Sequence, residues 1–214
     1  MNRVLIVVAF LVAAAALLAG CGGKETAETS AAEAQGATVV CPQAWKAGWQ
    51  RLANDVGAPV YCPSWMPRPL DGRIGGVYKN GRWVDEKDKS YLVSFLWVDH
   101  DAGVSREVHA NFRGYPGRTA VPICESTETV KGKTLRKPIP CFSDARGTRT
   151  VGDITATVYT VNEGIDAWHV LYAWKKDGSL YTVSEHVTAP YSYKQVVRNL
   201  DRMARGLVWL EPAS

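Results

Sequence analysis

The chain has 214 residues, a formal net charge of +4 and eight tryptophans. This length suffices for one well-buried domain and is short for two, and the aromatic content favours a packed globule. So small a positive charge does not indicate a nucleic-acid partner, and we expect none.

The first 20 residues have the pattern of a targeting segment. Arg3 supplies a positive start, and residues 4–18 form an apolar run that contains neither charge nor proline. The run is too short for a comfortable membrane span and leads into flexible polar sequence, so we expect a signal peptide over residues 1–20. A buried core helix or an N-terminal anchor helix is the alternative, but a core helix would carry polar positions on one face.

The apolar run ends in Leu18-Ala19-Gly20-Cys21, which resembles the lipobox of bacterial lipoproteins. The resemblance implies cleavage before Cys21 and attachment of lipid, including palmitate, to this cysteine. It also implies that the membrane is one partner of the protein and that the domain lies on the extracytoplasmic face of the cell membrane. Residues 21–40 lack aromatic side chains and are predicted to be a flexible tether, which leaves residues 41–214 as a single domain.

Four cysteines remain once Cys21 is assigned to lipid, an even number suited to disulfides in an oxidising compartment. Three pairings are possible, and we favour the sequential one, Cys41–Cys62 with Cys124–Cys141. A helix that begins after Cys41 and ends at Gly57, followed by an extended return, would bring Cys62 back near Cys41. A four-thiolate zinc site is the alternative, but no spacing resembles Cys-x-x-Cys.

The first half of the domain is predicted to hold one helix and then strands. Residues 42–56 repeat apolar side chains at helical spacing, with Trp45 and Trp49 in a core-facing stripe or, alternatively, on a ligand platform. Asn80-Gly81 predicts a two-residue hairpin between residues 77–79 and 82–84. Residues 85–89 are expected to form a charged loop, residues 90–98 a central strand, and residues 107–113 an alternating strand.

The segment between Cys124 and Cys141 is predicted to be a hairpin or a long loop. It carries a basic patch of Lys131, Lys133, Arg136 and Lys137. The patch serves solubility or lies against anionic lipid headgroups, and the sequence leaves both interpretations open.

The last third predicts strands over residues 154–161, 167–175 and 180–187, with a tight turn at Asp177-Gly178. Ser192 is a good N-cap for a helix that ends at Gly206, and residues 207–210 are predicted to add a closing strand. The fold class is therefore α+β. We expect an antiparallel meander with an N-terminal and a C-terminal amphipathic helix packed on it, and two disulfides.

Residues 174–183 followed by this helix resemble the ending of small envelope lipoprotein domains, of the half-barrel lipid-carrier type (LolA/RseB) or the PsbP/Mog1-like type. The whole chain resembles uncharacterised actinobacterial lipoproteins. These resemblances imply an envelope location and bring no known activity.

Hairpin register gives the most specific site prediction. A two-residue turn at Asp177-Gly178 pairs His169 with His186, on the sheet face opposite Trp174 and Tyr172. Trp168 and Val187 are predicted on the core face with those aromatic residues. Two imidazoles this close could bind one metal ion, with His109 or an acidic neighbour as a third ligand; the alternative is two histidines without a ligand.

Two other turns carry candidate ligand-binding residues. Arg113, Tyr115 and Arg118 surround a tight turn and could bind an anionic group, or the turn has no ligand at all. Asp99-His100-Asp101 could be a ligand cluster or a polar strand end.

No local motif of a hydrolase or of a phosphate-binding loop is present, so we name no catalytic residue and expect no cofactor. We expect a binding domain whose ligand is a hydrophobic or amphiphilic envelope molecule, held between the aromatic-rich sheet and the helices. The alternatives are a module that docks another envelope protein through a flat apolar face, and a hydrolase whose site assembles from distant residues. A cleft that joins His109 or His169 to a carboxylate and a hydroxyl would favour the hydrolase.

Overall fold

The computed structural model describes residues 38–100, 105–161 and 168–213. Thr38–Ser214 forms one compact unit of the chain. The predicted signal peptide, Cys21 and most of the predicted tether lie outside the described residues, as do Asp101 and the connection that begins at residue 162. None of the helices in the described part of the chain is both long enough and apolar enough to cross a membrane.

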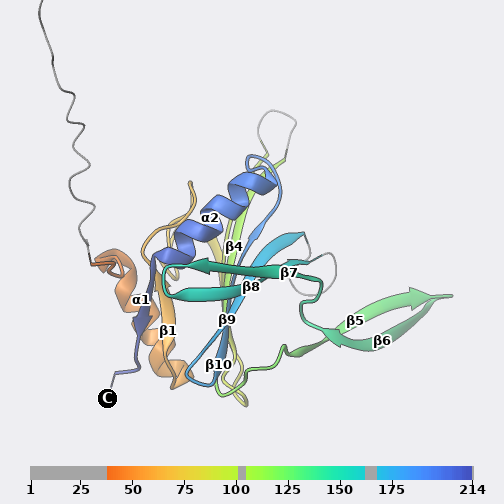
Figure 1. The fold of residues 1–214 in the computed structure, drawn as a ribbon. Coiled ribbons are helices and arrows are strands. Elements are labelled where there is room, and N and C mark those ends of the chain that lie inside the picture. Colours follow the sequence, from red (N-terminus) through yellow and green to blue (C-terminus); the bar gives the residue numbers. More distant parts are fainter. Residues whose placement is uncertain (1–37, 101–104, 162–167, 214) are drawn as a thin grey trace, which may run out of the picture. The chain divides into compact units, whose positions relative to one another are not determined.

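The unit is an α+β fold built on one antiparallel sheet of seven strands (Figure 1), as the sequence predicts. The spatial order of the strands is β2-β3-β4-β10-β9-β8-β7. Their bounds are β2 Lys79–Val84, β3 Tyr91–Asp99, β4 Arg106–Tyr115, β7 Ala145–Val151, β8 Ile154–Val161, β9 His169–Lys176 and β10 Ser179–His186.

The strand order corrects the expectation of a single meander. Strands β2 to β4 form one meander and β7 to β10 form a second one, and the two join where β4 pairs with β10. The chain leaves the sheet between them to form a separate hairpin of β5 (Ile123–Val130) and β6 (Lys133–Pro140). The pairing of β4 with β10 places residues from the middle of the chain beside residues near its end.

The predicted hairpin at Asn80-Gly81 is wrong. Strand β2 runs straight through both residues, with Asn80 opposite Phe95 and Gly81 opposite Ser94. The chain turns instead in the predicted charged loop, where Asp85 Oδ1 accepts hydrogen bonds from the backbone N–H groups of Lys87 and Asp88. Such side-chain to backbone bonds stabilise a turn directly, and pairing with the long strand β3 holds the Asn-Gly pair extended.

The two faces of the sheet are covered differently. One face carries the main core, a cluster of buried residues that includes Val93, Phe95, Val183 and Tyr172. The helices are α1 (Gln43–Val56) and α2 (Tyr193–Arg205). The opposite face carries a smaller apolar cluster of Tyr115, Cys141, Phe142, Leu171, Ala173 and Leu180.

Helix α1 begins after Pro42 and ends at Gly57, whose φ of 67° is the left-handed conformation that favours glycine. Trp49 is fully buried, and its ring centroid lies 5.5 Å from that of Phe112 on β4. Trp49 therefore belongs to the core. The N-cap of helix α2 is Ser192, whose backbone N–H donates to Gln195 Oε1 at 2.9 Å, and its C-cap is Gly206.

Both disulfides pair as predicted, Cys41 with Cys62 and Cys124 with Cys141. The first joins the start of α1 to β1 (Val60–Pro63), which pairs with the closing strand β11 (Leu207–Leu210). The second closes the base of the β5–β6 hairpin, which extends away from the sheet in Figure 1.

Candidate functional site

The predicted register of the last hairpin is confirmed. Lys176 pairs with Ser179, Trp174 with Tyr181, Tyr172 with Val183, and His169 with His186. Trp174 and Tyr172 belong to the main core. His169 and His186 therefore point to the opposite face of the sheet, as the two-residue turn at Asp177-Gly178 requires.

Trp168 corrects one part of that prediction. Its side chain is 67% exposed, and its φ of 65° places it in a turn ahead of β9. Because the strand begins only at His169, the alternation of faces does not extend back to Trp168. Val187, predicted on the same face, is partly buried against the main core.

His109 joins the two paired histidines, so three of the chain's four histidines meet on one face. The ring centroid of His109 lies 4.8 Å from that of His169 and 6.5 Å from that of His186. The rings of His169 and His186 are stacked, 5.0 Å apart and 11° from parallel. We refer to His109, His169 and His186 as the histidine cluster.

Glu107 supplies the acidic neighbour. It lies two positions before His109 on β4 and therefore on the same face of the sheet. Its Oε1 atom is 2.8 Å from His186 Nδ1 and 3.5 Å from His109 Nδ1. The hydroxyl of Ser94 on β3 lies 2.9 Å from the other ring nitrogen of His109, Nε2.

This arrangement can do two kinds of chemistry. Glu107, His109 and His186 each present one ligand atom, and these atoms all lie within 4.8 Å of one another, so the three residues could hold a metal ion. Ser94, His109 and Glu107 also follow the order hydroxyl, imidazole and carboxylate that activates a nucleophile. The side chains of His109, His186 and Glu107 are each between a fifth and a third exposed, so small solutes can reach them.

Arg113 and Tyr115 lie apart from the histidine cluster. Arg113 is four residues further along β4 than His109, which corresponds to about 13 Å in an extended strand. Arg113 and Tyr115 line a separate cavity of about 280 Å³ together with Arg118 and Asp88. The five candidate ligand-binding residues therefore belong to two different places on one face.

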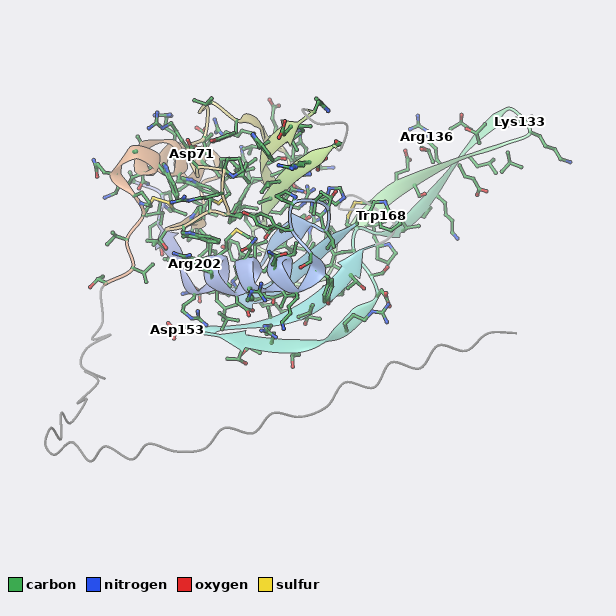
Figure 2. The ribbon with its side chains drawn as sticks, turned by 90° about the horizontal axis from the view of Figure 1, so that it is seen from above. Asp71, Lys133, Arg136, Asp153, Trp168 and Arg202 are labelled. Atoms are coloured by element: carbon green, nitrogen blue, oxygen red, sulfur yellow. A yellow bond between two sulfur atoms is a disulfide. The ribbon has the colours of Figure 1, made fainter. Side chains whose placement is uncertain are left out.

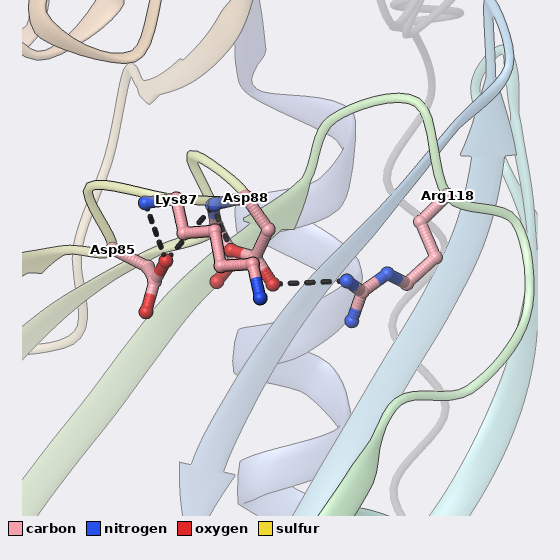
Figure 3. Close-up of polar contacts among 5 residues, drawn as sticks. Asp85, Lys87, Asp88 and Arg118 are labelled. Carbon is pink, nitrogen blue, oxygen red and sulfur yellow. Dashed lines mark hydrogen bonds and ion pairs between the residues drawn. The ribbon is translucent and has the colours of Figure 1, made fainter.

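Asp88 occupies the anion-binding position that Arg118 could offer (Figure 3). Arg118 Nη2 donates to Asp88 Oδ2 at 2.9 Å, while Asp88 Oδ1 accepts the backbone N–H of Ser90 at 2.9 Å. These bonds, first those from Ser90 and then the one from Arg118, hold the pKa of Asp88 below its ordinary value. Because Asp88 already neutralises Arg118, this cavity is a weak candidate for an anionic ligand.

Sequence reasoning missed an aromatic groove on the other side of the sheet. The groove has a volume of about 560 Å³ and lies between β9, the end of α2 and the β1–β11 pair. Its aromatic wall consists of Tyr61, Trp174 and Trp209, with the Tyr61 ring centroid 5.3 Å from Trp174 and 4.9 Å from Trp209. Burial raises the pKa of Tyr61, so this phenol stays neutral at physiological pH.

The rim of the groove is mostly basic. Lys175, Lys176 and Arg205 line it together with one carboxylate, Asp153. The Lys176 ammonium lies 4.4 Å from the centroid of the Trp209 ring. Across the described ranges, Lys175 and Arg205 form no ion pair, so the rim has a net positive charge. The one hint of this groove in the sequence is Trp209 in the closing strand, but no local pattern indicates that Trp209 lies beside Tyr61 and Trp174.

The basic patch lies on the β5–β6 hairpin. Lys131, Lys133, Arg136 and Lys137 are all exposed, and Figure 2 shows Lys133 and Arg136 on the arm that extends from the sheet. Arg136 also donates to Glu125 Oε1 at 3.0 Å across the hairpin. His100 follows β3 and does not join the histidine cluster in the described residues, and its neighbour Asp101 lies outside them.

No protein-family model matches this chain, and neither the curated proteins nor the solved structures include one that is significantly similar to it.

Proposed function

We propose that the protein is a lipid-anchored binding domain of the cell envelope whose ligand is an anionic amphiphile held in the aromatic groove. Cys21 carries the anchor, and the domain lies on the extracytoplasmic face of the cell membrane. The packing of both amphipathic helices on the sheet is part of this proposal. The end of α2 lines the groove directly, and strand β1, which follows α1, lines it together with its partner β11.

The observation that supports the ligand class is the pairing of an aromatic wall with a basic rim. Tyr61, Trp174 and Trp209 line the groove, and so do Lys175 and Arg205, which form no ion pair within the described ranges. A molecule with an apolar body and an acidic head satisfies both at once. The volume of about 560 Å³ is that of a small-molecule site.

Native mass spectrometry tests this proposal. The protein is extracted from its own membrane in a mild non-ionic detergent, and dodecanoate or the uncharged dodecanol is then added. We expect retention of dodecanoate in preference to dodecanol, and loss of this preference in the Lys175→Gln/Arg205→Gln variant. The matched control is Lys194→Gln/Arg198→Gln, which removes the same charge from exposed positions of α2. Equal retention of both compounds, or an equal loss in both variants, would count against the proposal.

A hydrolase is the second candidate, and one observation favours it. Ser94, His109 and Glu107 stand in the order of a nucleophile, its base and the carboxylate that orients the base. It ranks second because Glu107 is closer to His186 than to His109, by 2.8 Å against 3.5 Å. A fluorophosphonate probe that labels the wild type and fails to label Ser94→Ala would support it, whereas equal labelling or none would rule out Ser94 as the nucleophile.

A further inference from the structure

Glu107, His109 and His186 form a constellation that neither the aromatic groove nor the lipid anchor uses. They come from two neighbouring strands, and the β4–β10 pairing fixes their relative position, since Glu185 stands opposite Ala110 next to them. We propose that these three residues bind one divalent transition-metal ion, with zinc as the closest match to the donor set.

The donor atoms decide the class of metal. Two imidazole nitrogens and one carboxylate oxygen are ligands of zinc and related transition metals, while calcium and magnesium prefer oxygen alone. Two ligands bound tetrahedrally at about 2.1 Å from one zinc ion lie about 3.4 Å from each other. The distances from Glu107 Oε1 to the two ring nitrogens, 2.8 Å and 3.5 Å, bracket this value.

Ser94 orients one of the ligands. The Nε2 atom of His109 lies 2.9 Å from Ser94 Oγ. If the Nε2–H group donates this hydrogen bond, the Nδ1 atom carries the lone pair, and Nδ1 is the nitrogen that faces Glu107. In known metal sites the ligand histidine likewise donates a hydrogen bond from its other ring nitrogen, and this bond fixes its tautomer.

His169 is a positioning residue in this proposal. Its ring stacks on His186 at 5.0 Å and is almost fully buried, which fixes the orientation of His186. Rings that stack in parallel do not point their nitrogens at one common point, so His169 is not a ligand. Three protein ligands leave one tetrahedral position for water, the pattern of zinc sites that keep an open position.

Zinc titration of the full chain tests the site. The protein is purified in non-ionic detergent without a polyhistidine tag, stripped with EDTA, and titrated with zinc against a chromogenic chelator while its melting temperature is recorded. We expect one zinc ion bound per chain and a melting temperature that rises with zinc concentration. We expect Glu107→Gln and His186→Gln each to weaken zinc binding at least tenfold and to abolish the rise.

Two further variants separate ligands from neighbours. His100→Gln removes the one histidine outside the cluster and should leave zinc affinity unchanged. His169→Phe keeps a stacked aromatic ring and should keep the stoichiometry of one ion, with a smaller loss of affinity than His186→Gln. Circular dichroism of each metal-free variant checks that it is folded.

Three results would overturn the site. The first is no zinc bound at concentrations up to about 100 μM, where protein sites of this type are occupied. The second is equal affinity in the wild type and in folded Glu107→Gln and His186→Gln. The third is a loss in His100→Gln as large as the loss in His186→Gln.

Discussion

Asn199 of α2 donates a 2.8 Å hydrogen bond from Nδ2 to Oε1 of Glu185, a carboxyl group that is fully buried in the centre of the fold. Burial raises the pKa of Glu185 from its ordinary value of 4.5 to about 8. The folded protein therefore holds this proton at neutral pH, while the unfolded chain releases it.

This relationship predicts how stability depends on pH. Between pH 4.5 and about 8 the folded state binds more protons than the unfolded state at this site. The free energy of unfolding should therefore fall as the pH rises through this window, by up to about 1.4 kcal/mol per pH unit, and level off above it. Glu185→Gln is neutral at every pH and should lose this slope. Urea unfolding of the wild type and of Glu185→Gln at pH 5.5, 7.0 and 8.5 measures this slope. The same dependence of the free energy of unfolding on pH in both proteins would contradict the prediction.

Gly114 is required by the ring of Tyr91. A Cβ atom at residue 114 would lie 2.2 Å from Cε1 of this buried ring, so the ring or the backbone would have to shift within the packed core. We expect Gly114→Ala to destabilise the fold by about 2 kcal/mol, measured by urea unfolding. The matched control is Gly81→Ala on β2, where a Cβ atom meets nothing within 4 Å. A control as destabilised as Gly114→Ala would show that strand glycines matter here for another reason.

Asp201 connects α2 to the sheet. It accepts two hydrogen bonds from the Arg149 guanidinium on β7, and its Oδ1 also accepts the Tyr172 hydroxyl at 2.9 Å. Asp201→Asn should reduce stability by about 1.5 kcal/mol, because it weakens bonds that a charge strengthens. Asp55→Asn breaks only the exposed pair with Arg82 and should cost less than about 0.5 kcal/mol. Equal costs in thermal unfolding would refute this ranking.

Cys21 should decide where the protein is found. If the lipobox resemblance is correct, Cys21→Ser abolishes labelling by radioactive palmitate and leaves the signal peptide uncleaved. Ser30→Ala, a change in the same tether, should leave labelling and cleavage intact. Labelling that persists in Cys21→Ser would end the lipoprotein interpretation.

The basic patch on the β5–β6 hairpin predicts contact with anionic lipid. In vesicles that contain the lipidated protein, trypsin should cut at Lys131 and Lys133 more slowly when the lipid is anionic than when it is zwitterionic. The protection should disappear in 0.5 M salt, at about three times the usual ionic strength of cells, because screening removes the attraction. Cleavage at Lys194 on α2 serves as the internal control and should not change. Equal rates at the hairpin in both lipids would favour solubility as the role of these charges.

The sequence predicts the structure correctly where residues close together along the chain determine it. The turn at Asp177-Gly178 alone sets the register of β9 and β10, and with it the pairing of His169 with His186. His109 and Glu107 could not be placed by the same argument. They reach the histidine cluster through the pairing of β4 with β10, which joins segments about 70 residues apart and leaves no local trace.

Tertiary pairing also explains what the sequence predicted wrongly. Asn80-Gly81 is a strong hairpin signal by itself, yet six residues of β2 pair continuously with β3 and override it. The aromatic groove was missed for a related reason. Tyr61 and Trp209 face each other only because β1 pairs with β11, and these strands stand near opposite ends of the domain.

The β5–β6 hairpin is a two-stranded sheet of its own, so along each strand one side has no neighbouring strand in the described chain. The unpaired backbone N–H and C=O groups along such an edge can pair with a strand from a second molecule, which favours self-association. Strand β6 resists this through Pro138 and Pro140, which have no N–H to donate, and through the repulsion among its cationic side chains. The prolines and cationic side chains of β6 thus let the hairpin extend from the sheet while disfavouring the addition of a strand from a second copy.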